Sequence, residues 1–415
     1  MSARTAPHRA TPELRTVTEE TREDYLKAVS RGFHDTFNAE DWGPGVEQIE
    51  SERNFGFTVD GRWVSTTGAC TRVMTTPGGS VPVAAVTVVT VAPGYRRRGL
   101  LTQMMRHQLT QDVIARGTEP LALLWASESL IYGRFGYGRS TSLLSISGAT
   151  REMTFLPGVD LGGGSVDEVT KDEALAVAPG VRESFLADRP GALNRTKLEW
   201  DSNAHDPENR RRGASERRYL LHFAADGTPD GFAAFRTKWT DDGGEVMINE
   251  LDAATPQGYA RLWRFLLDLD LIRKFRFRSV PTDEPLRQLV ADQRAIKTEL
   301  HDATYARLTD LPRALAARKY TAELDVVLDV ADAFLPDLAG RYRVQAGPEG
   351  AEVTRTDASA DISLTVRDLG AIYLGGTPLT ALHRAGLIGE HTPGSVQAVT
   401  TAFSWPRAPH CPDDF

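Results

Sequence analysis

The sequence of 415 residues has few of the side chains that build metal sites or disulfide frameworks, and it has no long apolar run. Its two cysteines, Cys70 and Cys411, do not show the spacing of a zinc site or of a disulfide-rich domain. The histidines are scattered without ligand spacing. No stretch of about 18 apolar residues occurs, and the first residues lack the apolar segment of a secretory signal. We therefore expect a cytoplasmic protein with two unpaired thiols, no bound metal and no contact with a membrane.

An excess of basic charge is absent as well. The 48 lysines and arginines and 56 aspartates and glutamates give a formal net charge of −8. This balance argues against general nucleic-acid binding and is compatible with cationic substrates. Hydrophobic residues make up 41% and charged residues 25% of the chain, as is usual for a soluble globular protein. The length exceeds that of one ordinary core, so we expect two or three domains.

The most informative stretch is residues 86–105, VTVVTVAPGYRRRGLLTQMM. Residues 86–91 are mostly β-branched and predict a strand buried on both faces, which ends near Pro93 because proline cannot continue the ladder. Gly99 then opens a helix with apolar residues at helical spacing. The free N–H groups of a helix N-terminus attract phosphate, and the three preceding arginines supply the opposite charge. The stretch predicts a cradle for the pyrophosphate of coenzyme A.

Other nucleotide loops do not match this stretch. A GxxxxGK[ST] motif is absent, and so is a GxGxxG motif followed by an acidic residue on the next strand. An ordinary strand–helix turn with a basic cap is the alternative to a ligand site. In an acidic chain, a local arginine cluster is more typical of one anionic ligand site than of a basic surface.

The hydrophobic pattern predicts three segments. The first, residues 1–150, is expected to contain a helix at 22–33 and strands at 54–59, 62–76, 82–91, 121–126 and 143–147. The second, residues 151–303, starts with a glycine-rich joint at 156–165 and predicts helices at 173–187 and 258–269 and strands at 218–224, 231–238 and 245–251. The third, residues 304–415, predicts helices at 310–317, 366–374, 377–385 and 394–403 and strands at 320–330, 340–345 and 352–355.

The second segment repeats the first in outline but lacks the cradle. Its corresponding loop, ELDAATPQGYARLWRFL at residues 250–266, has no arginine cluster before the helix. A phosphate there would lack its countercharges, so we expect a degenerate, structural copy and one cofactor site per chain. The third segment has the pattern of a small α+β unit with an apolar interior.

A second motif, WASESLIYGRFGYGRST at residues 125–141, follows an expected buried strand. The order Val91, Pro93, Arg96 and Gly99 resembles the acetyl-CoA loop of the GNAT acetyltransferases. With the IYGRFGYG turn, the degenerate repeat, a terminal unit that looks like the sterol-carrier fold and a final phenylalanine, the chain resembles the Eis family of those enzymes over nearly its whole length. The resemblance implies an α/β and α+β fold: a catalytic GNAT domain at 1–150, a degenerate one at 151–303, and a sterol-carrier-like domain at 304–415.

The resemblance also implies an acetyl-CoA-dependent N-acetyltransferase. Its general acid would be Tyr132, and its general base would be the α-carboxylate of Phe415. Two acidic residues, Asp35 and Asp414, would lie in the substrate pocket. The residues that would bind acetyl-CoA are Val89, Val91, Arg96, Arg97, Gly99, Leu100 and Ser127.

The chemistry of these residues is consistent with those roles but leaves alternatives. A phenol with a pKa of about 10 is a reasonable donor to a thiolate, whereas an α-carboxylate, with a pKa of about 3.3 to 3.7, is a weak base unless burial raises its pKa. Tyr137 could exchange roles with Tyr132, and Glu128 is an alternative base. Without the resemblance, the terminus at Phe415 would be read as frayed.

Several aromatic and basic residues are ambiguous in the sequence. Trp42 and Trp63 could line an amine pocket or simply pack. The basic run NRRRGASERR at residues 209–218 is expected to be a solvated loop.

The expected substrates are polycationic amines such as aminoglycosides, and family members assemble as hexamers. Whether antibiotic resistance is the biological role is left open. One alternative keeps the enzyme but makes the substrate a protein lysine or an N-terminal amine. The other is a carrier protein that binds an apolar ligand in the third segment.

Overall fold

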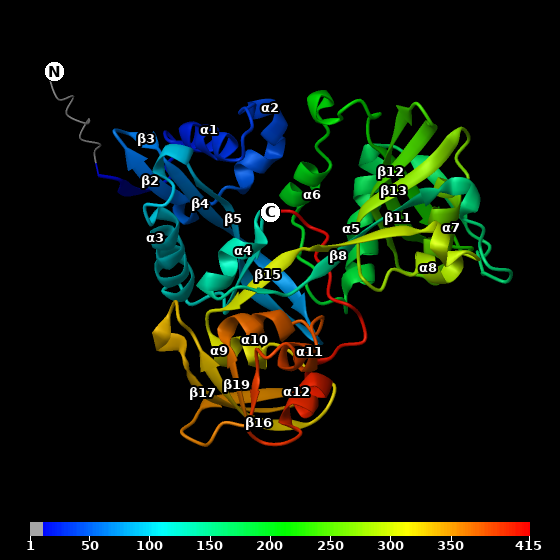
Figure 1. Cartoon of the computed structure of the whole chain (residues 1–415). Helices are drawn as coiled ribbons and strands as arrows, with labels where there is room; N and C mark the ends of the chain where they lie inside the picture. Colours follow the sequence, from blue (N-terminus) through cyan, green and yellow to red (C-terminus); the bar gives the residue numbers. More distant parts are fainter. Residues whose placement is uncertain (1–10) are drawn as a thin grey trace.

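The computed structural model describes residues 11–415, which form three lobes, each built around one β-sheet (Figure 1). The sheet of the first lobe has the order β1-β2-β4-β5-β6-β15-β7, with β3 paired to β2. Its strands are β1 (Glu13–Thr16), β2 (Phe55–Val59), β3 (Arg62–Trp63), β4 (Ser65–Thr76), β5 (Gly79–Val91), β6 (Leu121–Trp125), β7 (Gly138–Arg139) and β15 (Thr304–Leu308). The helices are α1 (Arg22–Gly32), α2 (Ala39–Trp42), α3 (Leu100–His107), which continues as a π-helix (Gln108–Ile114), and α4 (Ser129–Tyr132).

The sheet of the second lobe has the order β14-β8-β13-β12-β11-β10-β9. Its strands are β8 (Ser142–Ala149), β9 (Ser165–Val169), β10 (Arg218–Phe223), β11 (Pro229–Thr240), β12 (Gly243–Ala253), β13 (Ile272–Val280) and β14 (Lys297–Asp302). Its helices are α5 (Lys171–Leu186), α6 (Lys197–Asn203), α7 (Pro256–Leu267) and α8 (Leu286–Leu289).

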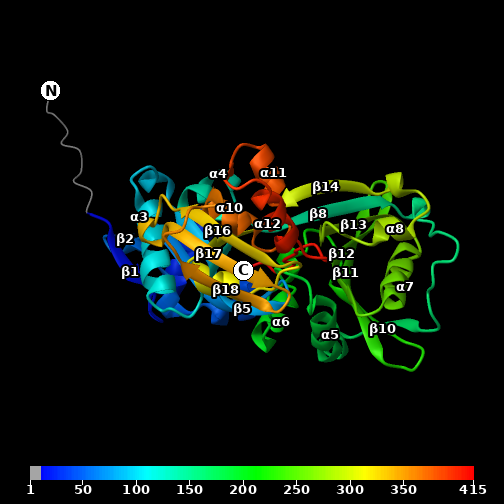
Figure 2. The same ribbon diagram turned by 90° about the horizontal axis from the view of Figure 1, so that it is seen from below.

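The third lobe has the sheet order β18-β17-β16-β19-β20. Its strands are β16 (Leu324–Ala331), β17 (Gly340–Gly347), β18 (Gly350–Arg355), β19 (Ile362–Thr365) and β20 (Gly389–Glu390). Its helices are α9 (Leu311–Ala316), α10 (Val366–Ile372), α11 (Leu379–Arg384) and α12 (Ser395–Phe403). Figures 1 and 2 together show this lobe packed against the first lobe, with the second lobe to one side.

The predicted helices at 22–33, 173–187 and 258–269 are confirmed as α1, α5 and α7. The strand predicted at 143–147, and β15 at Thr304–Leu308, which was not predicted, join sheets that the order of the chain does not indicate. β8 leaves the first lobe and pairs with β13 and β14, while β15 returns to the first sheet and pairs with β6 and β7. Every residue of β15 is buried, so this strand completes the core of the first lobe. The two lobes are thus tied by an exchange of strands.

β5 and β6 separate near the cradle. β5 pairs with β4 along its whole length, but it pairs with β6 only from Val83 to Val86. A bulge in the β4–β5 pairing coincides with a positive φ of 49° at Val88. The expectation that residues 86–91 are buried on both faces is therefore wrong: Val86 and Thr90 are buried, and the others are half-buried because β6 no longer covers that edge.

The third lobe packs on the IYGRFGYG turn of the first. A Cβ on Gly138 would lie 1.9 Å from the carbonyl oxygen of Arg367, and a Cβ on Gly136 would lie 1.7 Å from Nη1 of Arg307. Arg307 is fully buried, donates to the carbonyl of Phe135 at 2.7 Å and pairs with Asp332 at 2.6 Å. These glycines are required because α10 and Arg307 approach the backbone too closely for a side chain.

Candidate active site

The loop between β5 and α3 has the backbone of an anion-binding cradle. Arg97 and Gly99 have positive φ values of 60° and 80°, and Gly99 directly precedes α3. Alternation of left- and right-handed residues points successive N–H groups into one concavity, which the start of α3 extends. All three arginines are exposed. Nε of Arg96 donates to the carbonyl of Val91 at 3.2 Å, and the guanidinium of Arg98 lies 5.0 Å from the ring centroid of Tyr95.

The other residues predicted to bind the cofactor flank the separation of β5 from β6. Val89 is half-buried and packs against the cluster that contains Tyr132, and Val91 packs against the cluster of Leu100. The side chain of Leu100 is buried in the core, so only its backbone N–H is suited to face a ligand. Ser127 is exposed, two residues after the end of β6.

A valine at position 99 is expected to weaken acetyl-CoA binding by about tenfold or more, because a β-branched residue at positive φ costs about 1–3 kcal/mol and moves the N–H groups. Isothermal titration of acetyl-CoA measures the change. Gly61→Val is the matched control, since Gly61 has a φ of 74° with open space around it and lies in the turn between β2 and β3. An equal loss of affinity in both variants would contradict a role for the loop at Gly99.

Tyr132 ends α4, directly after β6 in the chain. Its side chain is 4% exposed, and burial, with a smaller contribution from the charge of Glu128, raises its pKa to about 12. The ring of Tyr137 lies 6.2 Å away at a steep angle. Tyr137 is fully buried and its hydroxyl has no hydrogen-bond partner among the described residues. Complete burial makes Tyr137 less suited than Tyr132 to reach a substrate, and Glu128 is exposed.

The C-terminal tail, residues 404–415, is docked along the second lobe rather than frayed. Arg189 donates to the carbonyl of Ala408 at 2.7 Å, and the N–H of His410 donates to the carbonyl of Pro190 at 2.8 Å. The tail ends at the centre of the molecule (Figure 1). There, the indole N–H of Trp125, the last residue of β6, donates to the carbonyl of Asp413 at 2.9 Å. Phe415 itself is half-buried and packs against the hydrophobic core shared by the first and third lobes.

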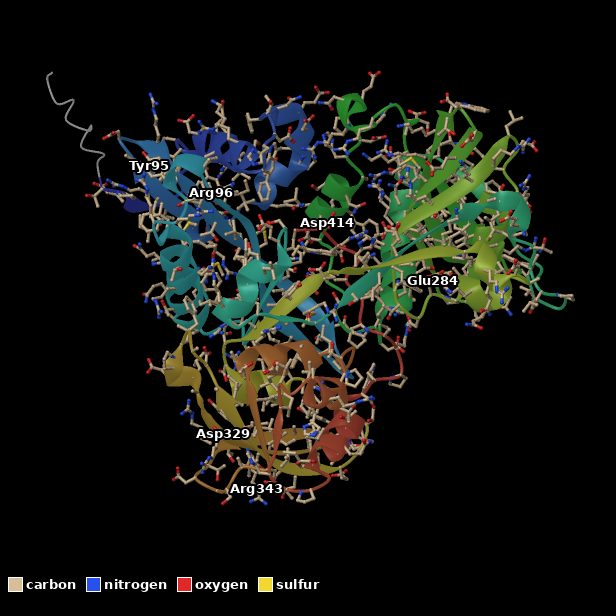
Figure 3. All side chains as sticks on the ribbon, in the orientation of Figure 1. Tyr95, Arg96, Glu284, Asp329, Arg343 and Asp414 are labelled. Atoms are coloured by element: carbon tan, nitrogen blue, oxygen red, sulfur yellow. The ribbon has the colours of Figure 1, made fainter. Side chains whose placement is uncertain are left out.

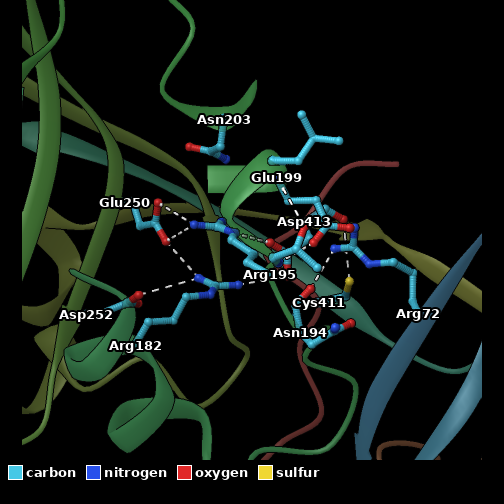
Figure 4. Close-up of polar contacts among 12 residues, drawn as sticks. Arg72, Arg182, Asn194, Arg195, Glu199, Asn203, Glu250, Asp252, Cys411 and Asp413 are labelled. Atoms are coloured by element: carbon cyan, nitrogen blue, oxygen red, sulfur yellow. Dashed lines mark hydrogen bonds and ion pairs between the residues drawn. The ribbon is translucent and has the colours of Figure 1, made fainter. Parts of the chain in front are cut away.

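Two buried arginines of the second lobe hold the carboxylate of Asp413. Nη2 of Arg182 donates to it at 2.7 Å, and Nε of Arg195 donates to it at 2.6 Å. Both arginines also donate to Glu250, at 2.7 and 2.8 Å (Figure 4). Burial alone would raise the pKa of Asp413, but the charges of Arg195 and Arg182 outweigh it and lower the pKa. The ionised side chain therefore fixes the tail two residues before its end. This role of Asp413 was not predicted from the sequence.

A cavity of about 660 Å³, the interlobe cavity, lies beside this clamp. It is lined by the ends of β6, β12 and β13, by α6 with its flanking loops, and by the tail. Asp414 lines the cavity and lies between the first two lobes, whereas Arg96 lies farther out on the first lobe (Figure 3). Loss of hydration among the surrounding groups and the neighbouring Asp413 raise the pKa of Asp414, although the residue remains exposed to solvent. Asp35 is exposed, accepts a hydrogen bond from the N–H of Thr36 at 2.8 Å, and is not among the lining residues.

Two acids of the second lobe in this cavity have strongly raised pKa values. Burial raises the pKa of Glu284 from 4.5 to about 8, although the Leu286 backbone and the charge of Arg189 act in the opposite direction. The hydroxyl of Tyr259 donates to Glu284. Burial, followed by the charge of Glu250, raises the pKa of Asp252 to about 7. Residues of the second lobe, which the sequence analysis expected to be structural, therefore line much of this cavity.

The raised pKa of Glu284 predicts a specific pH dependence of stability. Between about pH 4.5 and 8 the folded chain keeps a proton that the unfolded chain loses, so the stabilisation is complete below pH 4.5 and is lost as pH rises to 8. The free energy of unfolding of wild type should therefore fall relative to that of Glu284→Gln, by up to about 1.4 kcal/mol per pH unit in this window. Urea denaturation of both proteins from pH 4 to 9 measures the difference. Curves that stay parallel would contradict the prediction.

The structure places Trp63 in the core, whereas Trp42 and part of the basic run at 209–218 line cavities. Trp63 is buried and packs edge-to-face on Tyr25, with ring centroids 5.2 Å apart. Trp42 is half-buried and lines a second cavity of about 420 Å³ beside the first. In the basic run, Arg210 is exposed and Arg217 is half-buried, and both also line the two cavities.

The described part of the chain contains no disulfide, no metal-binding cluster and no membrane-spanning helix. Neither Cys70 nor Cys411 is in a disulfide, and burial raises the pKa of both thiols. Within residues 11–415, no group of three or more histidine, cysteine, aspartate or glutamate side chains is arranged to hold a metal. No helix in this range is long and apolar enough to cross a membrane.

Three family models match consecutive parts of the chain. An acetyltransferase (GNAT) domain matches residues 13–140, a second acetyltransferase (GNAT) domain matches residues 191–308, and a sterol carrier protein domain matches residues 311–412. The first match contains the cradle and Tyr132, and the second ends with β15. The predicted fold, two GNAT domains followed by a sterol-carrier-like domain, is confirmed.

Relatives match most of the length of this chain. An uncharacterized N-acetyltransferase of Streptomyces avermitilis is 41% identical over 374 residues, which are 88% of this chain and 90% of that protein. N-acetyltransferase Eis of Mycobacterium tuberculosis is 34% identical over 339 residues, 80% of each protein. The crystal structure of Eis1 from Mycobacterium abscessus has a TM-score of 0.83 at 31% identity and covers 97% of this chain and 100% of that one.

This chain belongs to the Eis family of GNAT N-acetyltransferases. The predicted enzyme class is confirmed, and acetyl-CoA is the acyl donor of GNAT acetyltransferases. The first lobe fits that donor: the loop at Arg97 and Gly99 presents backbone N–H groups for a pyrophosphate, and the edge of β5 beyond Val86 is not paired to β6. The second GNAT domain has no comparable loop, because Thr255 already caps α7 and Pro256 follows it.

Proposed function

We propose that this Eis-family enzyme acetylates an amine of a small molecule bound in the interlobe cavity, with Tyr132 as general acid and the carboxylate of Phe415 as general base. The observation that supports this most is the hydrogen bond from Trp125 to the carbonyl of Asp413. It brings the end of the chain to the end of β6, the strand that leads into Tyr132. The acid and the base would then come from opposite ends of the sequence.

The cofactor side and the amine side are separate in this arrangement. Val89, Val91, Arg96, Arg97, Gly99, the N–H of Leu100, and Ser127 would hold acetyl-CoA, which when bound supplies the acetyl group as a thioester. The amine would enter from the interlobe cavity, which Asp414 lines; Phe415 follows directly in the chain but is not among the lining residues. Phe415 is half-buried, and such partial burial would disfavour the charged form of its carboxylate and make it a stronger base than a fully exposed one.

Tyr132 keeps its proton at neutral pH because its pKa is about 12. A full transfer to a thiolate, whose conjugate acid has a pKa of about 8.5, would therefore be uphill. The hydroxyl would act first as a hydrogen-bond donor to the sulfur as negative charge develops there, and give up the proton late. Such donors lower barriers most when they are fixed in advance, as Tyr132 is by its packing.

The proposed substrates include polycationic amines such as aminoglycosides, with protein lysines and N-terminal amines as the alternative. Asp414 is placed to attract a cation, whereas Asp35 would have to act from outside the cavity. An apolar-ligand carrier is less well supported, because buried Tyr320, Tyr373 and Phe403 surround Arg318 in the core of the third lobe. The predicted hexamer and cytoplasmic location stay predictions.

The test is an assay of purified enzyme with acetyl-CoA and a panel of aminoglycosides, polyamines and peptides. Free thiol should be released only when an amine is present, and mass spectrometry should find the product 42 Da heavier, about the mass added by one acetyl group. Binding of acetyl-CoA without transfer to any amine of the panel would contradict the proposal.

A further inference from the structure

The two central parallel strands of the second GNAT domain diverge in the same way as β5 and β6. β12 pairs with β13 only from Gly244 to Ile248, just as β5 pairs with β6 only as far as Val86. A bulge accompanies the divergence in both domains, in the β11–β12 pairing of the second and in the β4–β5 pairing of the first. Such bulges redirect side chains and are frequent beside functional sites. The second domain therefore keeps the strand geometry that the first domain offers to its acyl donor.

The interlobe cavity lies where β12 and β13 diverge. Its lining includes residues 249–252 of β12 and residues 278–280 of β13, which are beyond the last pair between the two strands. Tyr259 of α7, Glu284 and His410 also line it. The position of the donor in the first domain is thus matched in the second by a cavity with its own set of polar side chains.

Glu284 is the buried carboxyl group of this cavity that has no ion pair with a described residue. It is 7% exposed, and the hydroxyl of Tyr259 donates a hydrogen bond to it. The other buried acids of the lining already pair with arginines of the second lobe. These acids are Glu250, Asp252 and Asp413, and their partners are Arg182 and Arg195. A ligand cation would therefore find an unused carboxyl group at Glu284.

His410, on the C-terminal tail, brings a second polar group without a partner to the same cavity. It is 3% exposed, and its Nδ1 has no hydrogen-bond partner within residues 11–415. Burial, with a smaller contribution from the charge of Arg189, lowers the pKa of His410 to about 3, so its ring is neutral. A neutral imidazole does not repel a cation, and one of its nitrogens accepts a hydrogen bond. A ligand with N–H groups would satisfy it.

The basic side chains around Glu284 do not exclude a cation. Arg189 is the charged neighbour of Glu284, and it already pairs with Asp283 at 2.8 Å and donates to a carbonyl of the tail at 2.7 Å. Arg407 lines the cavity and also pairs with a carboxylate. Arg278, on β13, is exposed, so solvent and salt screen its charge.

We propose that the opening between β12 and β13 is an acceptor subsite, in which Glu284 binds a second cationic group of the amine substrate. Figure 3 shows Asp414 between the first two lobes and Glu284 within the second lobe. An acceptor that reaches both acids therefore carries its two cationic groups at separate ends. This inference rests on the proposed function, since it adds a subsite to the same cavity.

Binding at this subsite is coupled to the loss of a proton. In the free protein, Glu284 keeps its proton up to about pH 8, its raised pKa. A bound cation favours the carboxylate, so the O–H bond breaks, the proton leaves to the buffer, and the carboxylate pairs with the cation while it keeps the hydrogen bond from Tyr259. Affinity should therefore rise by up to about tenfold per pH unit toward pH 8 and level off above it.

Calorimetric titration of agmatine into enzyme saturated with coenzyme A tests this coupling. Agmatine has a guanidinium group at one end and a primary amine at the other, and both stay charged from about pH 6 to 9. Titrations in buffers of different ionisation enthalpy count the protons released. We expect close to one proton per bound agmatine at pH 7 and about a tenth of that at pH 9. No binding, or no proton release at pH 7, would overturn the proposal.

The variant Glu284→Gln assigns the proton to this side chain. It should bind agmatine about tenfold more weakly at pH 8 and lose the proton release seen in wild type at pH 7. Glu183→Gln is the matched control, since Glu183 is an exposed acid of α5 outside the cavity lining, and it should behave as wild type. Release that persists in Glu284→Gln would come from another acid, such as Asp252, and would overturn the assignment.

Initial rates separate the subsite from the proposed function. At pH 8, kcat/KM for agmatine should exceed that for hexylamine, which lacks the second cation, by at least about tenfold. In Glu284→Gln the KM for agmatine should rise about tenfold with kcat nearly unchanged, because the lost contact is the same in the ground and transition states. Equal values for the two amines overturn the subsite but not the acetylation. If neither amine is acetylated, proton-linked binding that is lost in Glu284→Gln still supports the subsite.

Discussion

Replacement of Tyr132 by phenylalanine is expected to lower kcat by about 10²- to 10⁴-fold, the usual contribution of a positioned general acid, and to leave acetyl-CoA affinity largely unchanged. The substitution removes only the hydroxyl, and the ring stays in its cluster with Val89 and Phe135. With a pKa of about 12 the hydroxyl is protonated across the working pH range, so the loss should be nearly independent of pH between 6 and 9. Initial rates and calorimetric binding of acetyl-CoA measure the two effects.

Tyr137→Phe is the matched control for this change. The two rings lie 6.2 Å apart in one cluster, but the hydroxyl of Tyr137 is buried without a partner. Removing a buried hydroxyl that makes no hydrogen bond costs little and can stabilise the fold. This variant should therefore keep its kcat and unfold at the same temperature or higher. Similar losses of kcat in both variants would show that Tyr132 acts by packing rather than as an acid.

Replacement of Asp413 by alanine is expected to lower the free energy of unfolding by about 3–5 kcal/mol, because it removes one partner of a buried ion-pair cluster. Arg182 and Arg195 would keep Glu250 but lose the group that ties them to the tail. The tail would also lose the position of its last two residues, so kcat should fall together with stability. Urea denaturation and initial rates measure both. Unchanged stability would contradict the clamp.

An extension of two residues past Phe415 separates the carboxylate from the clamp. It leaves Asp413 and both arginines in place but moves the α-carboxylate away from its position beside Asp414. Stability should then stay near that of wild type while kcat falls by about 10²-fold, as expected for loss of a general base. A fully active extended enzyme would show that the terminal carboxylate is not the base.

Features set by neighbouring residues in the chain could be predicted from the sequence. The cradle is one: a β-branched strand, a proline, arginines and a glycine follow one another within 14 residues, and the positive φ of 80° at Gly99 agrees with that prediction. Amphipathic spacing located α5 and α7 in the same way. The absence of an arginine cluster near residue 255 likewise predicts that the second GNAT domain does not bind the cofactor, and this stays a prediction.

The strand exchange could not be predicted in this way. β8 and β15 have ordinary strand patterns, and their sheets are decided by which edges are left open once the other strands have paired. The glycines of IYGRFGYG are required by tertiary packing as well as by the turn itself. Gly138 is required because α10, more than 200 residues later in the chain, packs on its backbone.

The sequence by itself predicted the cofactor loop, because its residues are close together in the chain, and the resemblance to the Eis family supplied Tyr132 as the candidate acid. The charge of the interlobe cavity was decided only by the tertiary structure. An acidic chain suggested a pocket for cations, but folding pairs Glu250 and Asp413 with Arg182 and Arg195, so these carboxylates are not free to attract a cation. The physical reason is that the field in a cavity depends on which charges are neutralised by near neighbours, and composition does not record that pairing.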